Sequence, residues 1–251
     1  MTYLQSLAWL ILTLAPLLVS QRFLHREIQA VLLILTRRAD LTIALFSLIF
    51  FPGVLLHEIS HWVAAKLLGV RTGRISLFPR PTGKGRLQMG YVETAETDWL
   101  RDALIGAAPL ISGGLFVAYA GILRLGAGQS WMQLVPENFP AAVQGILATY
   151  AQPDFWLWFY LIFVVSSMMF PSASDRRTWL PVVLILGVLS GIFILAGFGP
   201  WLSVHLGEPL QIIIQTTTVI FFISGVVHIC LLIPAWVTRM LLSRITGLSV
   251  S

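Results

Sequence analysis

Residues 41–68, LTIALFSLIFFPGVLLHEISHWVAAKLL, decide the fold of this chain, because they form an apolar run long enough to cross a bilayer and carry an H-E-x-x-H pentapeptide. A helix turns by about 100° per residue, so His57 and His61 project from one face, about one turn apart. This spacing suits two imidazoles that share one zinc ion, with Glu58 beside the metal as a base for water.

The membrane setting of the pentapeptide favours a metal site over a chance match. H-E-x-x-H also occurs on solvated surface helices that bind no metal. Ionisable side chains inside a bilayer are costly unless a metal, a partner or water satisfies them, and by default they indicate a functional site. We therefore expect zinc at His57 and His61.

The composition is that of an all-α polytopic membrane protein. The chain has 251 residues, of which 57% are apolar and 11% charged, and its mean hydropathy is +0.85. We predict about six transmembrane helices, at residues 4–20, 41–68, 100–123, 154–171, 178–198 and 210–236. Residues 22–38 have an apolar stretch too short to cross, bounded by arginines, and we expect an interfacial amphipathic helix there.

The first apolar run and the single cysteine restrict how the chain is anchored and which side chains can bind a metal. The first apolar run has no basic residue before it and no small-residue cleavage site after it, so we expect a retained anchor. Cys230 is the single cysteine, which excludes a disulfide framework and a thiolate zinc site. Metal ligands must then come from histidines and carboxylates.

The distribution of basic residues along the chain predicts a membrane topology. We expect no nucleic-acid partner. The net charge is +5, and six alternating spans place eleven basic residues on one side and five on the other, so we expect that first side to be the cytoplasm. The five on the other side are Arg22, Arg26, Arg37, Arg38 and Arg124. In an alternative arrangement, residues 22–40 fold back shallowly on the cytoplasmic side.

Residues 1–251 read as a single membrane-embedded domain with two polar loops. In the loop 69–99, apolar and polar residues alternate on both sides of a segment rich in proline and glycine, which predicts a small cytoplasmic β-hairpin or sheet after the second span. The loop 125–153 contains three prolines and is expected to be extracytoplasmic, with a short helix at about 141–150.

A catalytic zinc ion normally has three protein ligands, so a third must be found. Asp175 follows Pro171 at the end of the fourth predicted span, on the same side as the two histidines. His228, in the sixth predicted span, is the rival, although a lone histidine on an apolar helix is more often a hydrogen-bonded core residue. The remaining candidates are Asp154, His205 and Glu208.

The motifs resemble those of the site-2 proteases, the intramembrane zinc metalloproteases of peptidase family M50. The resemblance rests on His57 to His61, on the segment 106–112 (GAAPLIS) and on the segment 171–175 (PSASD), and it covers the second to fourth predicted spans. It implies that Glu58 is the general base, that Asp175 is the third ligand, and that a membrane-associated β-sheet follows the motif helix. Ser112 stands where the family has an asparagine, and we expect it to contact the substrate or the oxyanion.

We therefore expect a zinc metalloendopeptidase with one Zn²⁺ per chain, which cleaves single-span membrane proteins within or near the lipid bilayer. The expected location is a prokaryotic plasma membrane, with the active site toward the cytoplasm. The alternative is a non-catalytic membrane protein, either a pseudoprotease scaffold that binds clients or a metal-binding component of a transporter. An intact Glu58 argues against the scaffold, and the clustering of acidic and histidine residues on one side argues against the transporter.

Overall fold

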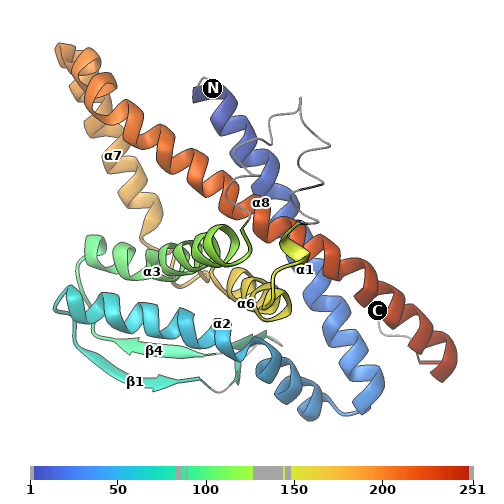
Figure 1. The fold of residues 1–251 in the computed structure, drawn as a ribbon. Helices are drawn as coiled ribbons and strands as arrows, with labels where there is room; N and C mark the ends of the chain where they lie inside the picture. Colours follow the sequence, from blue (N-terminus) through green and yellow to red (C-terminus); the bar gives the residue numbers. More distant parts are fainter. Residues whose placement is uncertain are drawn as a thin grey trace.

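The computed structural model describes residues 3–77, 79–82, 86–88, 90–126, 144 and 148–248, and it is predominantly helical (Figure 1). The long α-helices are α1 (Tyr3–Thr36), α2 (Ala39–Leu67), α3 (Trp99–Ala118), α6 (Phe155–Met168), α7 (Trp179–Phe193) and α8 (Gly199–Thr246). The π-helical segments η1 (Tyr119–Arg124) and η3 (Ile194–Phe198) extend α3 and join α7 to α8. The strands are β1 (Thr72–Ser76), β2 (Arg80–Thr82), β3 (Arg86–Gln88) and β4 (Tyr91–Thr94).

Four helices of the described chain are long and apolar enough to cross a membrane. They are α1, α2, α3 with η1, and the bent helix that runs from Trp179 to Thr246. Helix α7 has no buried residue, so its leucines, valines and isoleucines need an apolar surrounding. This surface fits a protein embedded in lipid.

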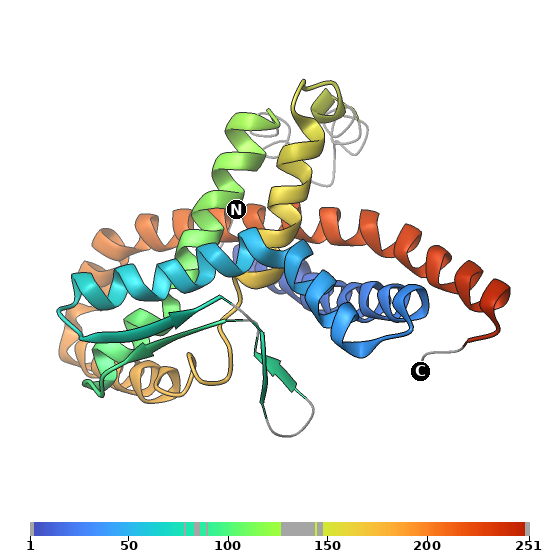
Figure 2. The same ribbon diagram turned by 90° about the horizontal axis from the view of Figure 1, so that it is seen from below.

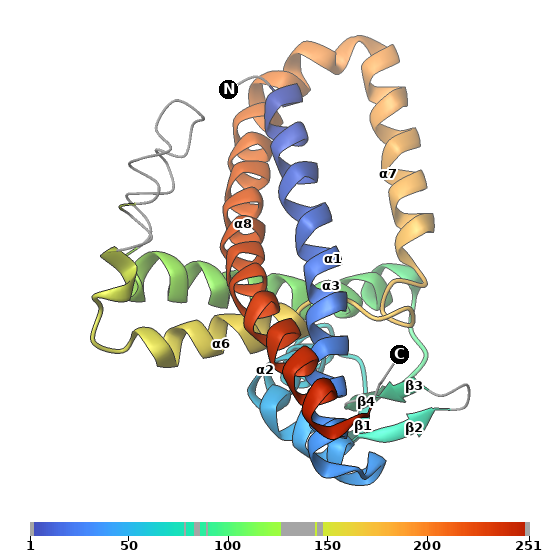
Figure 3. The ribbon, with the colours of Figure 1, turned by 90° about the vertical axis from the view of Figure 1, so that its right-hand side faces the viewer.

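The number of spans differs between the sequence prediction and the helices that the structure contains. The predicted fourth span corresponds to α6, which has 14 residues and is short for a bilayer. The predicted fifth and sixth spans lie in the bent helix, in which Gly197 has a φ of 89° and interrupts the helical geometry. Figure 3 shows the chain turning back there, so that α7 and α8 are separate arms. The count of six stays a prediction.

Helix α1 runs without interruption through the predicted first span and the predicted interfacial helix at 22–38. The structure therefore shows no separate helix at 22–38, because no glycine or proline lies between Pro16 and the end of α1. The helix ends at Thr36, after which Arg37 takes a left-handed backbone conformation with a φ of 53°. Arg38 then precedes α2.

The C-terminal half of α1 lies beside the C-terminal half of α8. Glu27 of α1 accepts a hydrogen bond from the Nε of Arg239 in α8, and the two side chains form an ion pair. The arginines at 22–38 and those at 239 and 244 therefore lie at one end of the molecule. This corrects the predicted division, which placed the two groups on opposite sides of the membrane. The alternative, in which residues 22–40 fold back shallowly, does not match either, because residues 22–36 continue α1.

The loop 69–99 forms the predicted β-hairpin, in two parts. β1 pairs with β4 in antiparallel fashion, with Ile75 opposite Val92, and β2 pairs with β3 further out. Figure 2 shows β1 and β4 lying along α2, while β2 and β3 project away from the helices. The hairpin thus brings the start of β4 next to the motif helix. Its cytoplasmic location stays a prediction.

The core lies where α1, α2, α3, α6 and α8 cross. Figure 3 shows α3 and α6 side by side, crossing the α1–α8 pair steeply. Gly53 lets α2 approach α6 closely, because a Cβ atom there would overlap the carbonyl oxygen of Val164. The largest fully buried apolar side chains are Leu17, Leu24, Phe50, Val117, Ile162, Val164 and Met169. Most of the predicted loop 125–153, including most of its predicted helix, lies outside the described residues.

Candidate metal centre

His57 and His61 face each other across one turn of α2, as their spacing predicts. Their ring centroids are 4.8 Å apart in an edge-to-face arrangement, and their Nε2 atoms are 3.1 Å apart. Both imidazoles are largely shielded from solvent, with side chains 15% and 10% exposed. Two ring nitrogens are therefore held together in a protected place.

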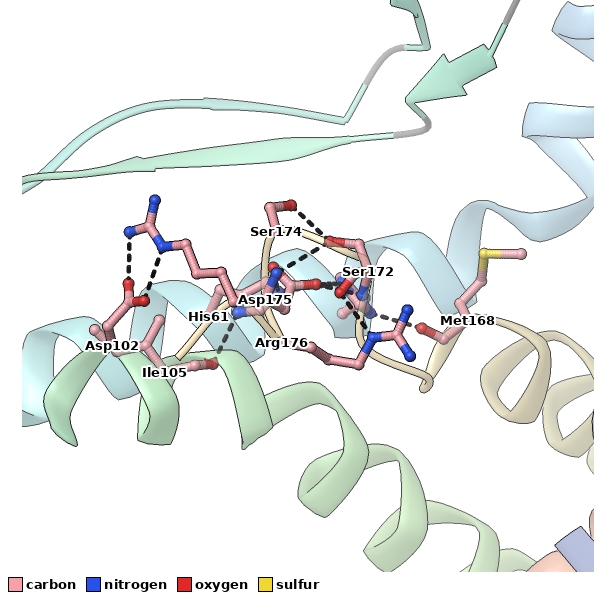
Figure 4. A network of polar contacts seen from close by, with 10 residues as sticks. His61, Asp102, Ile105, Met168, Ser172, Ser174, Asp175 and Arg176 are labelled. Carbon is pink, nitrogen blue, oxygen red and sulfur yellow. Dashed lines mark hydrogen bonds and ion pairs between the residues drawn. The ribbon is translucent and has the colours of Figure 1, made fainter. Parts of the chain in front are cut away.

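Asp175 completes the group from the loop between α6 and α7. Its Oδ1 lies 3.6 Å from Nε2 of His61 and its Oδ2 lies 3.9 Å from Nε2 of His57. The backbone N–H of Ser172 donates to Oδ2 at 2.7 Å and orients the carboxylate (Figure 4). The structure thus brings together His57, His61 and Asp175, with one ligand atom of each within 4.8 Å of the others.

The hydrogen bonds of the two imidazoles determine which nitrogen faces the centre. Nδ1 of His57 donates to the carbonyl oxygen of Met168 at 2.6 Å, and Nδ1 of His61 donates to that of Ile105 at 2.9 Å. A carbonyl can only accept, so Nδ1 carries the proton in each neutral ring and Nε2 carries a lone pair. Metal-binding histidines are typically held by such a bond from the second nitrogen.

Three acceptors therefore converge on one point: two Nε2 lone pairs and a carboxylate. A metal cation between them satisfies all three at once. Zinc bonds of about 2.0–2.2 Å in a tetrahedron place ligand atoms about 3.3–3.6 Å apart. The separation of 3.1 Å between the two Nε2 atoms and that of 3.6 Å between Nε2 of His61 and Oδ1 of Asp175 are close to those edges, and Nε2 of His57 lies 3.9 Å from the other oxygen, Oδ2. The group can hold a metal ion, and its donors fit zinc.

The charge of Asp175 suits a metal ligand. Burial of the carboxylate raises its pKa, but the adjacent His61 ring and the hydrogen bonds with Ser172 act in the other direction, and the net pKa falls to about 2. Asp175 is therefore ionised at neutral pH. A ligand that is already deprotonated needs no proton loss when a cation binds.

The loop that carries Asp175 is held against α3 by a second set of contacts. The guanidinium of Arg177 donates two hydrogen bonds to Asp102, each of 2.9 Å, and the hydroxyl of Thr178 donates a third at 3.1 Å. Gly106, one turn further along α3, faces the backbone of Asp175, and a Cβ atom there would overlap the Asp175 carbonyl oxygen. The third ligand thus reaches the histidines because α3 has a glycine at this point.

Replacing Gly106 with alanine is expected to displace the loop and lower the affinity for zinc by at least tenfold, because the added methyl group overlaps backbone and not a movable side chain. Competition with a chromogenic chelator measures the affinity. The matched control is Gly114→Ala on the same helix, whose Cβ would lie 3.7 Å from Ile220 in ordinary contact. Equal affinities for zinc in the two variants would contradict this account of Gly106.

Glu58 lies in the same cavity as the three candidate ligands His57, His61 and Asp175. This cavity has a volume of about 650 Å³ and is lined by residues of α2, α3, β4 and the loop after α6. The side chain of Glu58 is buried and lies against Gly90, where a Cβ atom would stand 2.8 Å from Oε1. Gly90, Tyr91 and Val92 form the wall opposite α2. The carboxylate of Glu58 and the three candidate metal ligands therefore share one water-accessible cavity.

Ser112 does not join this group. Its hydroxyl contacts that of Ser60 at 2.5 Å and donates to the carbonyl of Pro109 at 3.3 Å, so it links α3 to α2. Ser112 is also not among the residues that line the cavity. In the described chain it serves helix packing.

The rival ligands also lie elsewhere. His228 is fully buried, donates from Nδ1 to the Ser224 carbonyl at 2.8 Å and meets the Ser167 hydroxyl at Nε2, 3.0 Å away. His205 stacks on Trp201, and Asp154 lies 3.7 Å from Arg124. Glu208 is exposed on α8.

Sequence reasoning missed several residues that build the centre. The carbonyls of Ile105 and Met168 orient the histidines, yet a backbone carbonyl belongs to every residue and leaves no pattern. Gly90 lies in the loop 69–99, whose alternating pattern predicts a strand and no contact with Glu58. Asp102 and Arg177 carry opposite charges on two segments that meet in the fold, and no spacing rule connects them.

Comparison with protein-family models, with curated proteins and with solved structures finds no significant match.

Proposed function

We propose that this chain is an intramembrane zinc metalloendopeptidase of the site-2 protease type. The observation that carries the proposal is the convergence of two Nε2 lone pairs and one ionised carboxylate in a cavity that also contains Glu58. Two histidines and a carboxylate with an open fourth position are a ligand set of catalytic zinc, and a carboxylate next to it can act as a base.

His57, His61 and Asp175 hold the metal in this proposal, and Glu58 moves the proton. A zinc ion held by these three residues would supply Lewis acidity, which would make a water molecule acidic enough to react near neutral pH. Glu58 would take a proton from this water while the water oxygen attacks the peptide carbonyl carbon. Glu58 then gives the proton to the nitrogen of the departing amine, so one peptide bond and one water become a carboxylic acid and an amine.

The substrate in this proposal is a single-span membrane protein that is locally unwound. A helix hides its peptide carbonyls in its own hydrogen bonds, so the cleaved segment must be extended. Gly90 and the first residues of β4 line the cavity, and an extended segment in the cavity would run along this strand. The apolar helices support an integral membrane location, which we propose to be a prokaryotic plasma membrane with the site toward the cytoplasm.

A cleavage experiment with removal and return of zinc tests the proposal. The purified full-length protein is incubated in detergent with a panel of single-span membrane proteins, and new chain ends are mapped by mass spectrometry. We expect new ends inside or near the spans, their loss after treatment with a chelator, and their return with added zinc. If no chain end depends on zinc for any member of the panel, the protease proposal fails.

A further inference from the structure

A second cavity lies between α1, α2 and α8, formed by residues other than those of the metal centre. Its volume is about 840 Å³. It lies beside the C-terminal part of α1 and the start of α2. The lining residues are Phe23, Arg26, Glu27, Gln29, Ala30, Leu33, Ala39, Thr42, Ile43, Phe46 and Arg239.

The charge at this cavity is positive. Arg26 is exposed and forms no ion pair within the described part of the chain, whereas Arg239 is paired with Glu27. The nearby Asp40 is already bound by Arg38 through hydrogen bonds of 2.6 and 3.1 Å. The first residue of α2, Ala39, also lines the cavity, so the positive end of the helix dipole adds to the arginine charge.

Apart from Gln29 and Thr42, the rest of the lining is apolar. Phe23 and Leu33 of α1 face the cavity together with Ile43 and Phe46 of α2. A small inorganic anion would leave this apolar part unused. A ligand that matches both parts has an anionic head and a hydrocarbon chain.

We propose that this cavity binds an anionic phospholipid. The headgroup phosphate would accept hydrogen bonds from Arg26 and, beside it, from Arg239, and an acyl chain would lie along Phe23 and Leu33. Basic pockets between membrane helices recognise anionic headgroups in this way. The unpaired charge of Arg26 favours a lipid with net negative charge over a zwitterionic one. The proposal does not depend on the zinc site or on proteolysis.

Native mass spectrometry of the full chain, in micelles that contain either phosphatidylglycerol or phosphatidylcholine, tests this proposal. We expect the wild type to retain phosphatidylglycerol more strongly than phosphatidylcholine. Arg26→Gln is expected to weaken retention of phosphatidylglycerol about tenfold, because a charge-assisted hydrogen bond is lost. Arg22→Gln is the matched control, since it removes the same charge one turn away, outside the cavity.

Three outcomes would overturn the proposal. Equal retention of the two lipids by the wild type would show that charge does not select the occupant. Equal losses in Arg22→Gln and Arg26→Gln would show general attraction to the basic end. Displacement of the lipid by inorganic phosphate alone would show an anion site that makes no use of the apolar lining. Arg26→Lys keeps the charge and should retain the preference for phosphatidylglycerol. This result would show that the loss in Arg26→Gln comes from the missing charge and not from misfolding.

Discussion

Glu58→Gln is expected to lower kcat for peptide cleavage by about 10²–10⁴-fold while one zinc ion per chain remains bound. Glutamine has nearly the same shape but cannot accept a proton, so proton transfer to and from the reacting groups is lost. The variant keeps His57, His61 and Asp175, and the contact with Gly90 is preserved because the side-chain size is nearly unchanged. Cleavage rates at saturating substrate, measured beside zinc content by atomic emission, separate the two effects.

Glu208→Gln provides the control for this result, because Glu208 is exposed on α8 and is not among the residues that line the cavity. Its cleavage rate should equal that of the wild type. Equal rates for wild type and Glu58→Gln would exclude Glu58 as the base. A Glu58→Gln protein that holds substrate without cleaving it can also be used to capture clients from membranes.

Asp175→Ala is expected to lose zinc, with an affinity at least a hundredfold below that of the wild type. Changes to groups that merely orient a ligand cost about 10–100-fold in affinity, and removal of a ligand costs more. Two neutral imidazoles then remain, without the negative charge that the carboxylate supplies. Chelator competition measures the affinity, and the rise in melting temperature with added zinc should disappear, because a ligand stabilises only the protein that binds it.

Two control variants test whether this loss is specific to Asp175. Asp154→Ala removes an exposed carboxylate that pairs with Arg124, and it should bind zinc like the wild type. His228→Gln removes the rival ligand, which in the structure is bonded to Ser167 and Ser224, and it should also retain zinc. Full zinc binding by Asp175→Ala together with its loss in His228→Gln would overturn the ligand assignment.

The parts of the fold that depend on a local sequence pattern were predictable. Length and hydropathy marked the apolar runs that became α2 and α3, and alternation marked the hairpin of β1 and β4. The end of α1 was not predictable, because charged residues at 22–27 resemble a membrane boundary, although the helix continues beside α8 and pairs Glu27 with Arg239. Such a pairing joins residues far apart in the chain.

The site was predictable to a similar degree. His57, Glu58 and His61 lie within five positions, so helical geometry alone brings the histidines together. Asp175 remained one of several candidates until the resemblance to the site-2 proteases singled it out, and the structure places it beside both histidines. Ser112 stands at a motif position where the family has an asparagine, and in the structure it contacts Ser60.

The sequence by itself determined an apolar helical chain and the two imidazoles with a carboxylate on one turn, because hydropathy and helical periodicity act between near neighbours. Only the tertiary structure decided that the Asp175 loop reaches those imidazoles, through Gly106 and the Arg177–Asp102 pair. It alone placed Gly90 against Glu58 and brought the arginines of α1 and α8 to one end. These contacts depend on how helices pack, and packing depends on the shapes of many side chains at once.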